Sequence, residues 1–439
     1  MDANTLIKIG TKLPLGKGET CVVEAFLGGG GQGEVYRVST QRGQFALKWY
    51  FKRNQTRALK HALKELIDRG SPSPHFLWPN QIVEYKGYFG YLMDLRPTHY
   101  QKSQKLLDRK FSLSYSQVCS VALALAHSFR KLHVKGLSYQ DINWGNLFIN
   151  PDTGTILICD NDNVAPHGTS SIGISGTYGF MAPEVVRAEH KPDQYSDLFS
   201  LAVLMFQLLF LEHPFNGRRW AKIACWDDFA KKKLYGTEPI FIFDPTNEAN
   251  RPMAGVQDNA TLFWHLYPDH IKSLFIQVFT KGLTDRQNGR LLEEDWIDAF
   301  RDLRASIYPC PHCGRENISV PETAGKTTCW GKNCAKKLTP PPRLQIKIGK
   351  RERELVLNPD TKLYLYQLES HQHDVEKGDS IVGEVAKSPS GKWGLRNLSR
   401  EHWQYTAEGV TKDVEPGKAF VLNREITVSF GKAQGVVLV

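Results

Sequence analysis

The sequence predicts an α+β fold divided into several domains, and three observations support this prediction. The chain has 439 residues, whereas one domain usually holds roughly 100 to 200. Short alternating runs occupy residues 20–95, and helical apolar patterns dominate from there to 306. Four closely spaced cysteines and a further series of alternating runs come after 306. We therefore expect an α+β region over 1–306, a cysteine segment over 307–338, a proline-rich linker over 339–343 and an all-β sandwich over 344–439.

Charge and hydropathy narrow the classes of partner. A formal net charge of +10 and a pI near 9.0 indicate anionic partners such as nucleotides, but the basic residues are scattered, which argues against nucleic acid. The start, MDANTLIKIGTKLPLG, lacks the apolar core of a secretory signal. The longest apolar run, 201–211, is interrupted by Gln207 and is shorter than the ~20 residues of a membrane helix. We expect a cytoplasmic protein without a membrane span.

The first motif lies in VVEAFLGGGGQGEVYR, 22–37, which predicts a strand, a tight turn and a second strand. Gly28, Gly30 and Gly33, followed by Val35, fit the pattern G-x-G-x-x-G-x-V. Glycine lets a backbone close over phosphates, and Val35 would pack on a base. A plain hairpin turn explains the glycines equally well, but the second strand excludes a dinucleotide fingerprint, which opens a helix.

The next strand and helix supply a candidate ion pair. GQFALKWYF, 43–51, alternates as a strand and places Lys48 where it could reach phosphates, although a strand lysine is usually only solvated. RALKHALKELIDR, 57–69, has helical apolar spacing and is ended by Gly70. Glu65 on this helix is the candidate partner of Lys48. Residues 81–97 predict a further hairpin with an exit marked by a proline, which suits a hinge.

Two acids and an amide follow a predicted helix over 115–134. SYQDINWGNLFI, 138–149, sets Asp141 five residues before Asn146, as phosphoryl transfer uses them, although an Asx turn would give the same string. TILICDNDNVA, 155–165, is a buried strand ending in Asp160, whose carboxylate suits Mg²⁺. Asp162 is the alternative ligand.

Three later segments complete a resemblance. GTYGFMAPE, 176–184, ends in A-P-E; YSDLFSLAVLMFQLLF, 195–210, predicts a buried helix with Asp197 near its start; and LTDRQNGRLL contains Arg290. Together with the earlier motifs, residues 20–306 resemble the eukaryotic-like (Hanks-type) protein kinases. The resemblance implies a bilobal fold, with a small lobe over about 1–95 and a large lobe over 98–306.

The resemblance also implies the roles of individual residues. They are catalysis by Asp141, Lys48 and Glu65; ATP binding by Leu27, Gly28, Gly30, Gly33, Val35, Ala46, Lys48, Met93, Asp94 and Phe148; Mg²⁺ binding by Asn146 and Asp160; and structural support by Glu184, Asp197 and Arg290. The implied reaction is transfer of the γ-phosphoryl group of ATP to Ser or Thr hydroxyls of proteins, the kinase itself included. Thr177 favours Ser and Thr acceptors.

The chain departs from the family at its catalytic loop. Tyr139 and Gln140 stand where the family has His and Arg of H-R-D, and Asn143 replaces a lysine. Without the arginine, a phosphorylated loop lacks its cationic partner. We expect constitutive activity, or switching by the C-terminal region, with little dependence on the candidate phosphosites Thr169, Ser170, Ser171 and Ser175. A pseudokinase that scaffolds partners and a small-molecule phosphotransferase remain alternatives.

The cysteine segment predicts a metal site. Cys310, Cys313, Cys329 and Cys334 follow the pattern C-x2-C-x15-C-x4-C in a chain without a signal peptide. Four thiolates can close a tetrahedral Zn²⁺ site, and the C-x2-C turn is similar to a zinc ribbon. Four free thiols in a linker are the alternative.

The last region predicts an all-β sandwich. RLQIKIG, RELVL, KLYLYQL, SIVGEVA, WGLRNL, WQYTA, AFVLN, ITVSFG and GVVLV are short alternating runs separated by turn residues. GKWGLRNLS with VEPGKAFVLNREITVSFG resembles the second half of a forkhead-associated domain, and Ser399-Arg400-Glu401-His402 gives an alternative register. Neither register holds the full phosphate-binding set, so a regulatory or docking role is favoured. The domain combination is similar to that of bacterial kinases of tellurite-resistance systems, which implies a PP2C-type phosphatase and a von Willebrand A protein as partners.

Overall fold

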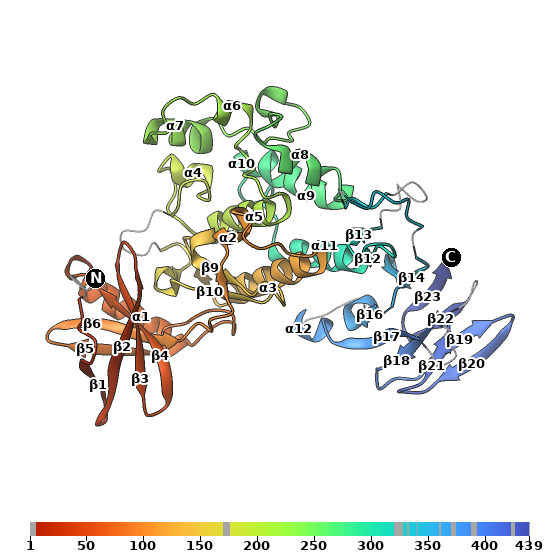
Figure 1. Ribbon diagram of the computed structural model, residues 1–439, viewed down its shortest axis with the longest axis horizontal. Helices are drawn as coiled ribbons and strands as arrows, with labels where there is room; N and C mark the ends of the chain where they lie inside the picture. Colours follow the sequence, from red (N-terminus) through yellow and green to blue (C-terminus); the bar gives the residue numbers. More distant parts are fainter. Residues whose placement is uncertain are drawn as a thin grey trace. The chain divides into compact units, whose positions relative to one another are not determined.

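A computed structural model describes residues 6–169, 176–319, 328–331, 333–339, 341–359, 361–369, 375–387, 393–422 and 426–438 (Figure 1). The chain divides into two compact units. The first comprises Met1–Leu113, Ser120–His265 and Lys272–Trp296, and the second comprises Ser114–Cys119, Leu266–Ile271 and Ile297–Val439. Among the described residues, none of the helices combines the length and the apolar character needed to cross a bilayer.

The small lobe of the first unit is an antiparallel six-stranded sheet with one helix. The strand order is β1-β2-β3-β4-β6-β5. The strands are β1 (Lys12–Gly16), β2 (Glu19–Gly29), β3 (Gly33–Thr40), β4 (Gly43–Tyr50), β5 (Gln81–Tyr85) and β6 (Tyr88–Asp94). Helix α1 (Arg57–Arg69) has the predicted bounds: the side chain of Thr56 caps its first turn, Gly70 ends it with φ of 68°, and it buries Leu63 and Leu66.

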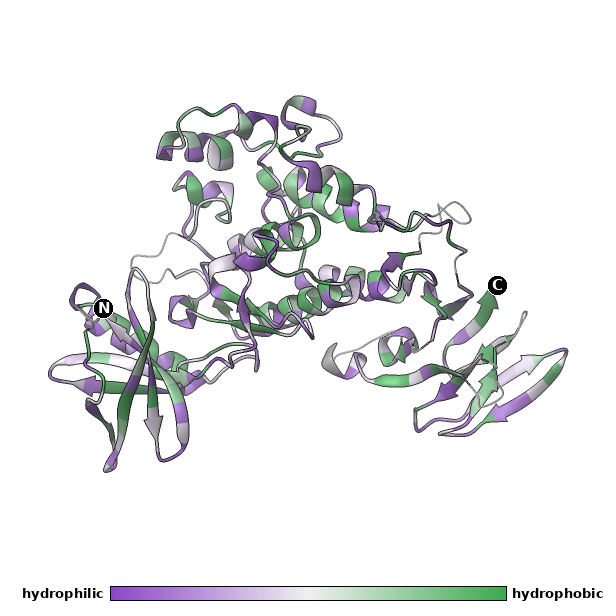
Figure 2. Ribbon diagram, viewed as in Figure 1, coloured by the Kyte–Doolittle hydropathy of each residue, from purple (hydrophilic) through white to green (hydrophobic). Residues whose placement is uncertain are grey.

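The large lobe is mainly helical. Its helices are α2 (Gln104–Leu107), α3 (Tyr115–Val134), α4 (Pro183–Val186), α5 (Gln194–Phe210), α6 (Arg218–Ala221), α7 (Asp228–Lys232), α8 (Asp258–Trp264), α9 (Asp269–Phe279), α10 (Lys281–Thr284) and α11 (Glu293–Ala305). Helix α5 begins with a capping box between Asp193 and Ser196 and is buried along nearly its whole length. Its residues are mainly hydrophobic (Figure 2). The apolar run 201–211 is therefore a core helix.

Short strands of the large lobe carry the loops of the candidate site. β9 (Leu147–Ile149) lies between β10 (Ile156–Ile158) and β7 (Gln101–Lys102), and β8 (Leu137–Ser138) pairs with β11 (Ala165–Pro166). The segment 139–146 therefore runs between β8 and β9, and 159–164 runs between β10 and β11. This antiparallel pairing brings the two loops to the same edge, because Cys159 N donates to Asn146 O at 2.9 Å.

The second unit contains a hairpin and two β-sheets. The hairpin is β12 (Ile307–Pro309) with β13 (Glu316–Ile318). One sheet has the order β15-β14-β23-β22-β19-β20 and the other β16-β17-β18-β21. Their strands are β14 (Arg343–Ile348), β15 (Arg351–Val356), β16 (Lys362–Tyr364), β17 (Ile381–Lys387), β18 (Trp393–Asn397), β19 (Trp403–Ala407), β20 (Val410–Val414), β21 (Ala419–Val421), β22 (Thr427–Ser429) and β23 (Gln434–Leu438), with the short helix α12 (Val375–Gly378).

The all-β prediction matches these two sheets, with two differences. Strand β20 was not predicted, because its residues are exposed except for Val414 and it pairs only at the edge of its sheet, so it lacks an apolar alternation. Strand β14 begins at Arg343, within the expected linker. Both sheets contribute to one core, in which Trp403, Leu344, Leu363 and Leu395 are almost completely buried.

Candidate active site

The catalytic loop is held by the first turn of α5. The carboxylate of Asp197, 1% exposed, accepts hydrogen bonds from the backbone N–H groups of Tyr139, at 2.6 Å, and Gln140, at 2.9 Å. Gln140 has a positive φ of 72°, which turns the chain sharply before Asp141. Asp197 thus positions the catalytic loop through its backbone.

The residues that replace the family's His and Arg both form hydrogen bonds through their side chains. Tyr139 is completely buried; its ring packs edge-on against Phe129 and its hydroxyl donates to the carbonyl of Cys159. The Gln140 side-chain amide donates to the carbonyl of Thr169 at 2.6 Å and to Ser138 Oγ at 3.0 Å. An uncharged side chain therefore ties the catalytic loop to the segment that follows β11, at Thr169.

Asp141 is bracketed by a hydroxyl and an amide. Its Oδ1 accepts from Thr177 Oγ1 at 2.8 Å, and its Oδ2 accepts from Asn146 Nδ2 at 3.2 Å. Asn143 Nδ2 donates to the same Thr177 hydroxyl at 3.1 Å. Burial raises the pKa of Asp141 above the usual aspartate range, against the lowering effect of these hydrogen bonds. The carboxylate is thus placed to accept a hydroxyl proton, and it already accepts a hydroxyl hydrogen bond.

Lys48 does not pair as the sequence predicted. Its Nζ lies 2.8 Å from both oxygens of Asp162 and 3.4 Å from Asp160 Oδ1. Glu65, the expected partner, is half-exposed and lies 3.8 Å from His61. The prediction of a Lys48–Glu65 pair is wrong for this structure, because α1 turns Leu63 and Leu66 inward and leaves Glu65 toward solvent.

Asp160 and Asp162 have different environments although they share one short turn. Asp160 has φ of 53°, and its side chain is 44% exposed. Asp162 is 1% exposed, and its carboxylate also accepts from Tyr50 Oη at 2.5 Å and Tyr91 Oη at 3.2 Å. Burial by itself would raise the pKa of Asp162, but Lys48 outweighs it and lowers that pKa. Of the two predicted alternatives for Mg²⁺, Asp160 is the accessible one, and it follows Cys159, whose backbone N–H donates to the Asn146 carbonyl.

The glycine turn joins β2 and β3 and contacts Lys48 through Gln32. Val35 lies opposite both Gly28 and Lys48 in the sheet. A Cβ on Gly33 would lie 2.2 Å from the carbonyl oxygen of Trp49, so only glycine allows this close approach of two strands. Gln32, which the sequence reasoning missed, accepts from Lys48 Nζ at 3.0 Å and donates to Asn163 Oδ1 at 3.4 Å. The only signal for Gln32 in the sequence was its position as a polar residue within a glycine cluster.

The predicted ATP-binding residues outside the G-x-G-x-x-G-x-V pattern lie on four strands, β2, β4, β6 and β9. Ala46 pairs with Met93 between β4 and β6, and both are buried. Leu27 and Asp94 are exposed. Phe148, on β9, is half-buried beneath the guanidinium of Arg96, 4.4 Å from its ring centroid. Gly30 N donates to Gly33 O at 2.9 Å within the glycine turn.

The structural residues of the large lobe form a buried ion pair. Arg290 donates to Glu184 Oε1 at 2.8 Å and Oε2 at 2.7 Å, and both side chains are buried. Burial alone would raise the pKa of Glu184, but Arg290 lowers it. Thr169 is described, whereas the candidate phosphosites Ser170, Ser171 and Ser175 lie outside the described residues.

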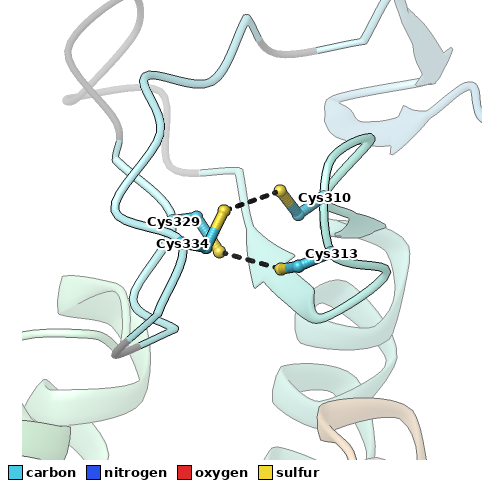
Figure 3. A group of neighbouring side chains, drawn as sticks. All are labelled: Cys310, Cys313, Cys329 and Cys334. Carbon is cyan, nitrogen blue, oxygen red and sulfur yellow. Dashed lines mark hydrogen bonds between the residues drawn. The ribbon is translucent and has the colours of Figure 1, made fainter.

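The four cysteines form a second candidate site, in the second unit. Figure 3 shows Cys310 and Cys313 on one loop facing Cys329 and Cys334 on another. The Sγ atoms of Cys310 and Cys334 are 3.8 Å apart, those of Cys313 and Cys329 are 3.6 Å apart, and all four lie within 4.8 Å of one another. These separations match the edges of a tetrahedron around one ion with Zn–S bonds of about 2.3 Å.

Comparisons with known proteins identify the family to which most of the first unit is similar. A family model described as "Protein kinase domain" matches residues 21–287, which is more than half of the chain. An Aurora kinase of Dictyostelium discoideum is 30% identical over 199 residues, covering 44% of this chain and 50% of that protein. G protein-coupled receptor kinase 2 of Caenorhabditis elegans is 26% identical over 216 residues, covering 45% and 29%. The human beta-adrenergic receptor kinase 1 is 26% identical over 215 residues, covering 45% and 30%. This chain thus spans half or less of these relatives, and the match to the family model shows that it belongs to the protein kinase domain family.

Proposed function

We propose that the protein is an ATP- and magnesium-dependent protein kinase that phosphorylates Ser and Thr residues of proteins, itself included. The observation that carries this proposal is the contact of Asp141 with the Thr177 hydroxyl at 2.8 Å, because a base for hydroxyl phosphorylation must accept a hydroxyl hydrogen bond. The relatives are named as kinases, which supports a protein substrate.

The mechanism follows from the positions of four side chains. Asp141 orients the acceptor hydroxyl and takes its proton while the hydroxyl oxygen bonds to the γ-phosphorus and the bond to the β-γ bridging oxygen breaks, leaving ADP. Lys48 binds the α and β phosphates, and the glycine turn covers them. Asn146 and Asp160 would hold Mg²⁺, whose charge offsets that of the phosphates. The raised pKa of Asp141 makes its carboxylate a stronger base.

Incubation of the full chain with labelled ATP and Mg²⁺ tests this proposal. We expect label on protein, with phosphoserine or phosphothreonine in the mass spectrum, and a loss of about 10²-fold or more in Asp141→Asn, in line with removal of a general base. The matched control is Asp152→Asn, on the exposed turn between β9 and β10, which should keep the wild-type rate. Label on a small acceptor would favour a small-molecule phosphotransferase, and ATP binding without transfer would favour a pseudokinase.

We also propose that the cysteine site holds structural Zn²⁺ in a zinc ribbon. The proposal is supported by the mutual proximity of four Sγ atoms from two facing loops. Segment 307–338 is short, so the ion would supply folding free energy that its apolar residues do not.

For the C-terminal sheets we propose a forkhead-like regulatory or docking domain. Asn397, completely buried, accepts from Ser399 Oγ at 2.7 Å and donates to Glu401 O at 2.7 Å. The Ser399 hydroxyl is thus used within its own turn, which supports a role other than phosphopeptide binding. A PP2C-type phosphatase and a von Willebrand A protein are the partners proposed from the sequence resemblance.

A further inference from the structure

The lysine that binds phosphates in protein kinases is normally braced by a glutamate from the helix of the small lobe. In this chain the carboxylate beside Lys48 comes from Asp162, in the 3-10 turn Asn161–Asn163. The contact is bidentate, with Lys48 Nζ 2.8 Å from each oxygen, and both side chains are at least nine-tenths buried. This pair is therefore a feature of the core between the lobes rather than a surface contact.

Two further groups hold Asp162 in place. Tyr50 follows Lys48 by two residues on β4, so both side chains point to the same face of the strand. Tyr91 lies on the adjacent strand β6, opposite Lys48 in the register of the sheet. Their hydroxyls donate to Asp162 Oδ2 at 2.5 Å and Oδ1 at 3.2 Å. Four polar contacts to one buried carboxylate leave it little freedom to move.

The polar contacts of the Lys48 ammonium are with Gln32, Asp160 and Asp162, and α1 contributes none of these residues. A cavity of about 140 Å³ lies between α1 and the turn after Asp160, and its lining includes both Glu65 and Asp162. The residues of α1 that line this cavity are Ala58, Leu59, Ala62, Glu65, Leu66 and Arg69, so the space separates one face of the helix from Asp162. The side chain of Glu65 is 50% exposed, while that of Asp162 is 1% exposed.

We propose that Asp162 is the positioning residue of Lys48, in place of a helix carboxylate, so that the grip on the ATP phosphates does not depend on the position of α1. The inference rests on the proposed phosphotransfer function. Asp160 and Asp162 then have different roles although they share one turn. The exposed Asp160 is available to bind the metal ion, and the buried Asp162 positions Lys48. The phosphate-binding lysine and the metal site are set by the same short segment.

Calorimetric binding of Mg²⁺–ATP to the full chain tests this inference, and it does not require phosphoryl transfer. Asp162→Asn keeps the shape of the side chain but removes the counter-charge of Lys48, so we expect the Kd for ATP to rise about tenfold or more. Glu65→Gln should leave the Kd unchanged. Because binding is measured directly, a protein that binds ATP but transfers nothing refutes the proposed function and still tests the role of Asp162.

A double-mutant cycle separates positioning from general stability. In a Lys48→Met background, Asp162→Asn should change the Kd no further, whereas a merely structural residue would act in both backgrounds. Where the protein is active, Asp162→Asn should raise KM for ATP more than it lowers kcat. Unchanged or tighter ATP binding in Asp162→Asn, or weaker binding in Glu65→Gln, would overturn the inference. If Asp162→Asn is unfolded at the assay temperature, the Kd of Glu65→Gln for ATP is the deciding measurement. An unchanged Kd supports the inference, and a raised Kd overturns it.

Discussion

Gln140 shows how a single substitution changes the regulation expected of the site. Its amide reaches the backbone carbonyl of Thr169 at 2.6 Å, a contact that needs neither a positive charge nor a phosphate. A kinase arginine at this place would bind a phosphorylated loop through charge. The neutral contact therefore supports a catalytic loop that is held in its working position without phosphorylation.

Removal of the loop hydroxyls should leave the proposed kinase activity largely intact. We expect the combined substitution of Thr169, Ser170, Ser171 and Ser175 by alanine to keep most of the phosphotransfer rate, because the backbone carbonyl that binds Gln140 is retained. The measurement is the initial rate on a protein substrate, with Asp141→Asn as the inactive reference. A near-total loss of activity would show that loop phosphorylation is required.

At the scale of elements, the large lobe is held by buried charges that connect helices. Glu184 on α4 pairs with Arg290 just before α11, and His133 on α3 lies between Asp197 on α5 and Glu293 on α11. These contacts join residues far apart in the chain. They fix the catalytic loop because Asp197 binds its backbone.

Breaking the Glu184–Arg290 pair should strongly destabilise the large lobe. Glu184→Gln leaves a buried guanidinium without its counter-charge, and we expect the free energy of unfolding to fall by about 3 to 5 kcal/mol. Denaturant unfolding measures this change. The control is Glu189→Gln, whose exposed carboxylate pairs with Arg187 and which should leave the midpoint nearly unchanged. Equal midpoints for the two variants would contradict the structural role of Glu184.

His133 should make stability depend on pH in a defined window. Burial by itself lowers the pKa of His133, but hydrogen bonds to Asp197 and Glu293 outweigh it and raise the pKa from 6.5 to about 9. Since the folded pKa is higher than the unfolded one, the stabilisation is fully present below pH 6.5 and is lost as the pH rises through 9.

The expected observation is a fall in the unfolding midpoint across this alkaline window. His133→Gln should lack this part of the pH dependence, whereas His61→Gln, on the exposed face of α1, should retain it. The same pH profile in His133→Gln and the wild type would contradict the assignment.

At the scale of the whole molecule, the cysteine segment differs from the kinase unit and from the C-terminal sheets in the size of its apolar core. The first unit has extensive apolar cores, including the almost completely buried α5. The cysteine segment has a small cluster around Tyr308, Leu338 and Val356, in which Cys310 and Cys329 are also buried. A metal ion would compensate for this small core.

Metal removal should therefore unfold the cysteine segment. We expect about one Zn²⁺ per chain by elemental analysis and protection of the four ligand thiols from a thiol reagent until a chelator is added. Cys225, an exposed thiol outside the cluster, provides the internal control because it should react in both states. Four reactive ligand thiols in the untreated protein, together with no released metal, would refute the zinc site.

The local sequence pattern was sufficient to predict many of the secondary-structure elements of this protein. The bounds of α1 and α3 follow from apolar spacing and flanking residues, and the β-domain strands follow from alternation, except β20, which is exposed at a sheet edge. The motif spacing also indicated the catalytic loop, because Asp141 and Asn146 lie on one short turn whose geometry depends on few residues. Such features depend on neighbours along the chain, and these are visible in its sequence.

The partner of Lys48 depends on packing between distant segments. Lys48 and Asp162 are separated by 114 residues, and their contact requires β4 and the turn after β10 to meet across the lobes. Spacing alone cannot show that α1 turns Glu65 toward solvent, nor that Asp162 is buried by two tyrosine hydroxyls while Asp160 stays open. Motifs indicate which side chains are available for the reaction, whereas burial and long-range contacts determine which carboxylate balances the lysine and which remains accessible to a metal ion.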